Sequence, residues 1–168
     1  EFGAGEYSPV IAVIDTGFDL EHPSFQNNRW ICEDGGTVSE FMNGDAPCVN
    51  GTHGWNFTEG ENNDNLEPTF FHGTAVAGII SSGNAEEGTH GVCPNCKIMF
   101  LKVPNSYRGT YLAIQYAIDN GVDIISVSDT VTISETSPSY ISLHEAVTNA
   151  IDSGILYVNS AGNSGIDV

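Results

Sequence analysis

Residues 9–17 read Pro-Val-Ile-Ala-Val-Ile-Asp-Thr-Gly, and this stretch decides the fold. Its apolar residues follow one another without polar alternation, and the run ends at a carboxylate, Asp15. An apolar run of this length is typical of a strand that is buried on both faces, as in a parallel sheet. Ligands bind at the carboxyl ends of such strands, so we expect Asp15 at the functional edge of the sheet.

Further apolar runs of strand length follow at 98–103, 122–127 and 155–158, and helical patterns lie between the runs. One helix is expected to begin at His72, a second spans Leu112–Ile118 and ends near Asn120-Gly121, and a third spans Leu143–Ile151 and ends by Gly154. This alternation predicts an α/β fold with a doubly wound, mostly parallel sheet and helices on both faces.

Residues 26–70 interrupt this alternation. They are rich in Asn, Gly, Asp and Glu, and we interpret them as a long surface excursion with one or two short strands around Trp55-Asn56-Phe57. The acidic stretch from Glu59 to Glu67 matches no metal-ligand spacing, so it predicts a solvated loop and not a metal site.

The chain has 168 residues, 22 of them acidic and 4 basic, which gives a formal net charge of −18. This charge excludes nucleic acids and anionic membranes as partners. No apolar run approaches the roughly 20 residues that cross a bilayer. The chain does not begin with Met, and any export signal is expected to have been removed already.

The four cysteines allow three pairings. Cys32 and Cys48 bracket a Gly- and Asp-rich stretch, whereas Cys93 and Cys96 form a C-x-x-C that elsewhere serves redox chemistry or half of a zinc site. Zinc needs a second close pair, which the 15-residue gap between Cys32 and Cys48 does not provide. We therefore predict the disulfides Cys32–Cys48 and Cys93–Cys96, in an extracellular or other oxidising compartment.

Two sequons support the same compartment. Asn50-Gly51-Thr52 and Asn56-Phe57-Thr58 fit the acceptor pattern for N-glycosylation, so both Asn50 and Asn56 are predicted sites.

Two more polar residues adjoin predicted elements. His72 begins a helix of small residues, so its imidazole is positioned as a general base toward the sheet edge. Asn163 lies in a Gly-flanked turn after a buried strand, where an amide can donate to a developing oxyanion. Asp15-Thr16-Gly17 also occurs in aspartic proteases, but those need two such aspartates, so that alternative requires a homodimer.

In chain order, Val13-Ile14-Asp15-Thr16-Gly17, His72-Gly73-Thr74 and Ala161-Gly162-Asn163-Ser164-Gly165 resemble the aspartate, histidine and oxyanion-asparagine segments of the subtilisin-like serine proteases, or subtilases. The segments GVCPNCKI (91–98) and NGVDIISVS (120–128) are similar to that family as well. The resemblance covers nearly the whole chain, so residues 1–168 are interpreted as the N-terminal part of a subtilase catalytic domain, incomplete at the C-terminus.

The resemblance implies a serine endopeptidase that is made as a zymogen. Asp15 would orient His72, His72 would deprotonate the serine, and Asn163 would stabilise the oxyanion. An extended peptide substrate would bind along two segments by β-augmentation. The substrate-binding residues that this implies are Ser126, Val127, Ser128, Asp129, Ser160, Ala161 and Gly162.

The nucleophile segment of the Gly-Thr-Ser-Met-Ala type does not occur within these residues, so the serine is expected C-terminal to Val168. Residues 1–168 alone are expected to be inactive and poorly soluble. Their expected partner is the C-terminal part of the catalytic domain, either in the same chain or as a separate chain. A catalytically inactive protein that binds peptides or a partner is the second hypothesis, and the dimeric aspartic protease is the third.

Two departures from the family pattern affect the expected site. Asp129-Thr130 stands where the family usually has an apolar residue and Gly, which predicts cleavage beside basic or polar side chains. Ser24 replaces an aspartate that ligates calcium in the family, so no specific metal site is predicted. Structural Ca²⁺ is compatible with the resemblance, and no cofactor is required.

Overall fold

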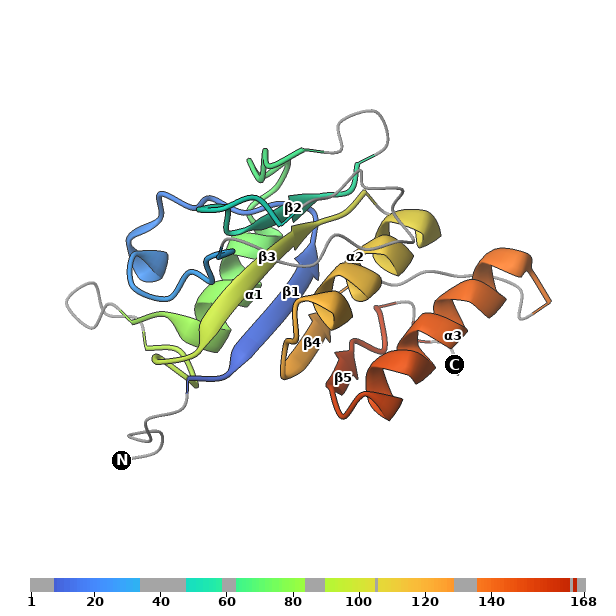
Figure 1. Ribbon diagram of the computed structural model, residues 1–168. Coiled ribbons are helices and arrows are strands. Elements are labelled where there is room, and N and C mark those ends of the chain that lie inside the picture. Colours follow the sequence, from blue (N-terminus) through green and yellow to red (C-terminus); the bar gives the residue numbers. More distant parts are fainter. Residues whose placement is uncertain are drawn as a thin grey trace.

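The computed structural model describes residues 8–33, 48–58, 63–83, 90–104, 106–128, 136–163 and 165. Within these residues, five strands form a sheet in the spatial order β2-β3-β1-β4-β5, and all neighbouring strands are parallel (Figure 1). The central strand β1 therefore lies between β3 and β4. The strands are β1 (Val10–Asp15), β2 (Gly54–Asn56), β3 (Lys97–Lys102), β4 (Ile124–Val127) and β5 (Leu156–Asn159).

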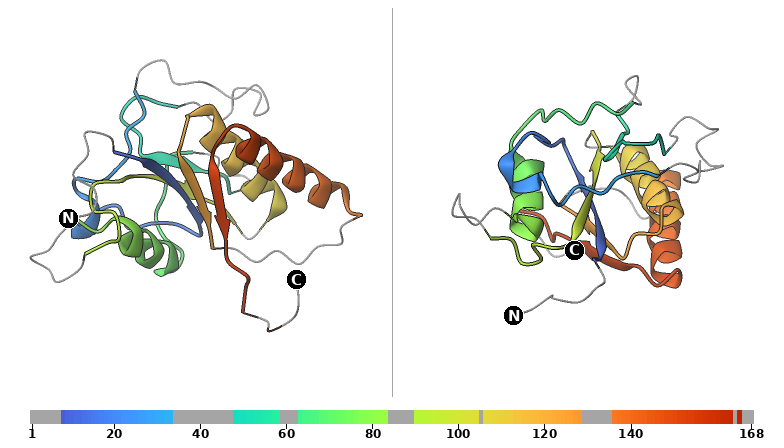
Figure 2. Two further views of the ribbon diagram at one scale, coloured as in Figure 1. Left: turned by 90° about the horizontal axis from the view of Figure 1, so that it is seen from below. Right: turned by 60° about the vertical axis from the view of Figure 1, so that its left-hand side comes forward.

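Helices cover both faces of the sheet (Figure 2). The helix α1 (His72–Ser81) lies on one face, together with the short 3-10 helix η1 (Pro23–Phe25), and α2 (Tyr107–Asp119) and α3 (Pro138–Asp152) lie on the other. Alternate residues of β1 point into the two resulting cores, Ile11 and Val13 toward α1, Ala12 and Ile14 toward α2 and α3. The predicted doubly wound α/β fold is confirmed.

Local sequence explains where the helices on the second face begin and end. Ser106 adopts extended backbone before α2, and its hydroxyl accepts a hydrogen bond from Gly109 N at 3.1 Å. Pro138 lies in the first turn of α3, where the missing N–H costs nothing. Gly121 and Gly154 follow the two helices with φ of +65° and +84°, a conformation that favours glycine.

Several described residues of the excursion between β1 and α1 are more deeply buried than the sequence predicts. It supplies the edge strand β2, which pairs with β3 in register Trp55↔Leu101. Trp55, Phe57 and Leu66 are buried in the two cores. The predicted short strand around Trp55-Asn56-Phe57 is therefore found as β2, and the few apolar side chains of this polar segment anchor its described residues on the sheet.

Strand β5 differs from its prediction as well. The run 155–158 was expected to be buried on both faces, yet Leu156 and Val158 are 58% and 48% exposed. Tyr157, which points to the other face, packs against the core beneath α2 and α3. No element among the described residues covers the α1-side face of β5. In the same residues, no helix is long and apolar enough to cross a membrane.

Candidate active site

Asp15 is the last residue of β1, at the carboxyl edge of the sheet, and only 4% of it is exposed. Its carboxylate oxygen Oδ1 accepts hydrogen bonds from Thr16 N at 2.7 Å and from Thr16 Oγ1 at 3.3 Å. Its main-chain carbonyl accepts from Val103 N, just past β3, at 2.8 Å. The Thr16 donors therefore hold the carboxylate, and the bond from Val103 holds the main chain behind it.

His72 is the first residue of α1 and lies against this carboxylate. The ring atom Nδ1 is 2.9 Å from Asp15 Oδ2 and 3.1 Å from Oδ1, and the two residues are 57 positions apart in the chain. A carboxylate can only accept, so Nδ1 carries the shared proton and the lone pair of the neutral ring is on Nε2. About half of the His72 side chain is exposed, compared with 2% of the Asp15 side chain. The pair is thus a buried acid that orients an accessible base.

Two glycines permit this approach. An ideal Cβ on Gly73 would lie 2.4 Å from the carbonyl oxygen of Gly17, closer than real Cβ atoms approach, and 3.0 Å from Asp15 Cβ. Gly17 has a φ of +129°, and a Cβ there would lie 2.7 Å from Pro68 Cα. The start of α1 can therefore reach β1 because neither residue has a side chain.

A short segment before His72, residues 66–69, connects the start of α1 to the chain just after β1, and we call it the strap. Phe18 N donates to the carbonyl of Leu66 at 2.7 Å, and Thr69 Oγ1 donates to the carbonyl of Thr16 at 3.1 Å. Both bonds join the strap to the chain just after Asp15. The sequence did not single out these residues, because exposed Thr and Pro in a polar loop carry no distinctive pattern.

The other predicted segments lie at the same edge of the sheet. Ile14 pairs with Val127, which puts Ser128 level with Asp15, and Ser160 N donates to the carbonyl of Val127 at 3.1 Å. The ends of β4 and β5 are therefore joined beside the acid–base pair. Asn163 follows a few residues past β5 and is exposed. Ser126, Ala161 and Gly162 are described here too, Gly162 with φ +77°, whereas Asp129 lies outside the described residues.

Both disulfides pair as the spacing favoured. Cys32 bonds to Cys48 and Cys93 to Cys96, with Cα–Cα distances of 5.6 Å and 5.4 Å. Cys93 N also donates to the carbonyl of Ile80, so the second disulfide lies where the end of α1 meets the approach to β3. Among the described residues, no group of three His, Cys, Asp or Glu side chains is arranged to hold a metal ion.

The two sequons differ sharply in access. Asn50 is exposed, but Asn56 is fully buried in β2. The Asn56 side chain accepts from Thr58 N at 3.0 Å and donates to Asn63 Oδ1 at 3.4 Å. A glycan on Asn56 is incompatible with this burial, so the prediction at that residue is corrected, whereas Asn50 stays a prediction.

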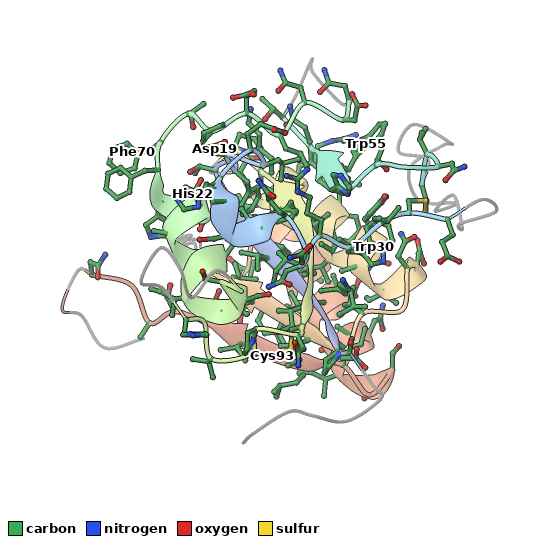
Figure 3. All side chains as sticks on the ribbon, turned by 90° about the vertical axis from the view of Figure 1, so that its left-hand side faces the viewer. Asp19, His22, Trp30, Trp55, Phe70 and Cys93 are labelled. Carbon is green, nitrogen blue, oxygen red and sulfur yellow. A yellow bond between two sulfur atoms is a disulfide. The ribbon has the colours of Figure 1, made fainter. Side chains whose placement is uncertain are left out.

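A groove of about 740 Å³ runs along the outer flank of α1, and the sequence did not predict it. It lies between the loop after β1, the residues before His72, and α1 itself. Figure 3 shows the side chains of Phe70, Asp19 and His22 at this flank. The adjacent pair Phe70-Phe71 within a polar segment was the sequence signal that could have indicated it.

Comparison with known proteins gives a consistent result. A model of the subtilase family matches residues 7–167. The chain is 33% identical over 164 residues to the major intracellular serine protease of Bacillus subtilis, and 29% identical over 160 residues to subtilisin E of the same species. The two alignments each cover 92% of this chain, but 43% and 34% of those proteins.

Solved structures agree on the fold. A cold-adapted subtilisin-like serine proteinase superposes with a TM-score of 0.67 at 23% sequence identity, over 96% of this chain and 49% of that one. The chain therefore spans less than half the length of each of these three relatives.

Proposed function

Because the chain belongs to the subtilase family, we propose that residues 1–168 carry the acid, the base and the oxyanion amide of a serine endopeptidase whose nucleophile lies outside them. One observation carries this proposal, the contact of His72 Nδ1 with Asp15 Oδ2 at 2.9 Å. This contact leaves Nε2 as the basic atom of an accessible imidazole. A serine hydroxyl brought to Nε2 would complete an Asp/His/Ser triad.

The reaction then proceeds in two acyl-transfer steps. His72 Nε2 takes the hydroxyl proton as serine attacks the peptide carbonyl, and Asp15 stabilises the imidazolium that forms. The imidazolium returns the proton to the leaving amine, and a water molecule repeats the sequence to release the acyl group. The burial of Asp15 supports this role, because a carboxylate shielded from water holds its partner in one orientation.

Two further roles belong to the same proposal. Asn163 donates its amide to the oxyanion of the tetrahedral intermediate, a contact whose loss typically costs about 10²–10³ in rate; that range was itself established on a subtilisin. The segments Ser126–Ser128 and Ser160–Gly162 bind an extended peptide through main-chain hydrogen bonds. Asp129 is proposed to favour basic or polar residues of the substrate.

The setting is proposed from the disulfides and from Asn50. Two disulfides indicate an oxidising compartment, such as the cell exterior, with a glycan on Asn50. The name of the Bacillus subtilis relative, an intracellular protease, applies to that protein. The required partner is the serine-bearing C-terminal part, and the exposed Leu156 and Val158 of β5 supply an apolar surface for it.

A catalytically inactive peptide-binding protein is the competing function. Retention of the hydrogen-bonded Asp15–His72 pair favours the enzyme, because a binding protein does not need a buried carboxylate behind an exposed imidazole. The dimeric aspartic protease is not retained. That mechanism needs two aspartates sharing a proton in an all-β protein, whereas Asp15 ends a strand of a parallel α/β sheet.

A serine-directed fluorophosphonate probe tests the proposal on the whole natural protein, with intact-mass and peptide-mass analysis. We expect one label on a serine outside residues 1–168, and we expect His72→Ala to abolish it. His144→Ala, which changes an exposed histidine of α3, is the matched control and should label normally. Absence of labelling in the processed wild type would favour the inactive binding protein, and labelling that survives His72→Ala would remove His72 from catalysis.

A further inference from the structure

The C-terminal end of α1 is capped by a segment that follows the helix in the chain. The last carbonyl groups of a helix have no partners within it. At this end of α1, residues 91–93 supply backbone donors to three such carbonyls. The pairs are Val92 N to Ile79 O at 3.0 Å, Cys93 N to Ile80 O at 2.8 Å and Gly91 N to Ser82 O at 2.9 Å. Asn28 Nδ2 donates to the carbonyl of Ser81 between them, so the end of the helix is fully capped.

Contacts of this kind matter to α1 because the helix buries little apolar surface. Its buried residues are all small, namely Gly73, Ala77 and Ser81. Val76 and Ile80 are only partly buried where they pack against the core. A helix of ten residues is marginal in water without tertiary contacts. The position of α1, and of His72 at its start, therefore depends on the contacts at its two ends.

The Cys93–Cys96 disulfide fixes the capping segment in place. It closes a turn in which Cys96 N donates to the carbonyl of Cys93 at 3.0 Å. Beyond the turn, the carbonyl of Cys96 accepts from Ser81 Oγ at 2.8 Å. The bridge therefore joins two points of contact with the end of α1. Figure 3 shows Cys93 toward the end of α1 that is remote from Phe70.

The two sulfurs of this disulfide differ in access. Cys96 is 2% exposed and belongs to the core between α1 and the sheet, whereas Cys93 is only partly buried. The preceding residue, Val92, is 85% exposed, so a thiolate can approach from the Cys93 side. The loop is also shorter than the one closed by Cys32–Cys48, so its closure stabilises the fold less, and the fold in turn protects this disulfide less against reduction.

We propose that Cys93–Cys96 is a redox modification site, which a small dithiol reductant opens and whose opening lowers the catalytic activity of His72. A thiolate of the reductant attacks Cys93 Sγ, forms a mixed disulfide with it and displaces the Cys96 thiolate. The second thiol of the reductant attacks this mixed disulfide and displaces the Cys93 thiolate. Two electrons thus pass to the protein, its two sulfurs take up two protons, and the reductant leaves as a disulfide.

Opening the bridge acts on His72 through α1. Without the covalent link, the donors on residues 91–93 are no longer held against the helix carbonyls, and water competes for these carbonyls. A less firmly placed α1 presents His72 to the serine in a wider range of positions, most of them unproductive. The enzyme is then most active in the oxidising compartment proposed above, and is weakened wherever a dithiol reductant is present. This inference rests on the proposed function, because it is measured through His72.

The test follows the cysteines and the activity together in the whole natural enzyme. Samples are equilibrated with dithiothreitol at graded ratios of reduced to oxidised reagent. Iodoacetamide labelling with peptide-mass analysis reports each cysteine, and a peptidyl aminocoumarin amide reports kcat/KM. We expect kcat/KM to fall about threefold to tenfold, in step with the labelling of Cys93 and Cys96.

Two paired variants assign the response to one disulfide. Cys93→Ala with Cys96→Ala should show the lowered kcat/KM at every ratio. Cys32→Ala with Cys48→Ala is the matched control and should respond to dithiothreitol as the wild type does. Cys93→Ser alone opens the same bridge and leaves Cys96 in the core, so it replaces the first pair if that pair melts below the assay temperature.

Every result of this test supports or overturns the inference. Labelling of Cys93 and Cys96 with unchanged kcat/KM overturns it and leaves the proposed function intact. Protection of both cysteines from labelling in fully reduced dithiothreitol overturns it as well. A response that persists without Cys93 and Cys96 belongs to another disulfide and has the same consequence. If the oxidised wild type neither cleaves the amide nor takes the fluorophosphonate label, the proposed function fails and the inference falls with it.

Discussion

An ideal Cβ on Gly73 would lie 2.4 Å from the carbonyl oxygen of Gly17, so the start of α1 meets the chain just after β1 at a point that has no room for a side chain. The neighbouring residue, His72, hydrogen bonds to Asp15. The distance between acid and base is therefore set by backbone contact, with glycine on both sides of it.

Gly73→Ala should move the start of α1 away from β1. The methyl group meets backbone that cannot yield, so we expect a loss of about 1–3 kcal/mol in the free energy of unfolding and at least a tenfold loss in kcat. Gly78→Ala is the control, because a Cβ there meets nothing within 4 Å. That helix substitution should stabilise by about 0.5–1 kcal/mol. Urea unfolding and kcat measured on both variants check this, and equal behaviour would contradict it.

Asp15→Asn tests the orientation of the imidazole. The amide keeps the shape of the carboxylate but cannot accept from Nδ1–H in the same way, so His72 loses its tautomer and its counter-charge. We expect kcat to fall about 10⁴-fold with little change in KM. Steady-state kinetics on a peptide amide measure it, with Asp152→Asn on α3 as a control for loss of one carboxylate.

Thr69→Val tests the strap. The substitution keeps the size of the side chain but removes the hydroxyl that donates to the Thr16 carbonyl at 3.1 Å. Thr69 is exposed, so its removal should cost less than about 1 kcal/mol of stability, while the looser His72 lowers kcat roughly threefold to tenfold. Thr69→Ser should restore kcat. Loss of stability in proportion to activity, without recovery in the serine variant, would contradict a positioning role.

Tyr116→Phe tests how much a buried hydroxyl contributes to the free energy of unfolding. Tyr116 is fully buried, its hydroxyl has no hydrogen-bond partner among the described residues, and burial raises the pKa of Tyr116 well above its ordinary value of 10.0. Removing the hydroxyl should therefore stabilise the fold by about 1–2 kcal/mol at neutral pH.

The same variant has a pH signature. Above pH 10 the unfolded chain releases the tyrosine proton and the folded chain keeps it, so the unfolded state binds fewer protons and stability falls as pH rises. The contribution is about 1.4 kcal/mol per pH unit. The stability gap between Tyr116→Phe and the wild type should therefore widen above pH 10 in urea titrations. A constant gap would show that the hydroxyl ionises equally in both states.

The two disulfides should differ in their contributions. Chain-entropy arithmetic gives about 3 kcal/mol for the loop closed by Cys32–Cys48, with a sequence separation of 16, and about 2 kcal/mol for Cys93–Cys96, with a separation of 3. Paired alanine variants measured by urea unfolding check the order. A larger cost at Cys93–Cys96 would mean that packing of the buried Cys96, and not loop closure, dominates.

The sequence predicts four of the five described strands well, because these four coincide with largely apolar runs. Each expected run agrees with an observed strand to within one or two residues, for example 9–14 with Val10–Asp15. The helix beginning at His72 is likewise found where it was expected. These elements follow from local composition, which is visible in the chain without knowledge of its neighbours.

What the sequence could not provide depends on contacts between distant residues. Burial of Asn56 comes from its place in the edge strand β2, and nothing in the sequon Asn-Phe-Thr reports it. Leu156 and Val158 are exposed because no described element packs on their face of β5, although the run itself is as apolar as the others. The strap and the α1 groove arise where residues 16–24 meet residues 66–79, which no single stretch encodes.

The pairing of β1 with β3 has a consequence for how this protein is made. Asp15 pairs with Lys102, and His72 lies between these two residues in the sequence. This long loop must close before the strand pairing provides any stabilising contact, and the entropy cost of closure slows folding. A nascent chain emerging from the ribosome therefore holds Asp15 long before Lys102 is synthesised, so the edge of the sheet around Asp15 forms only after β3 has emerged.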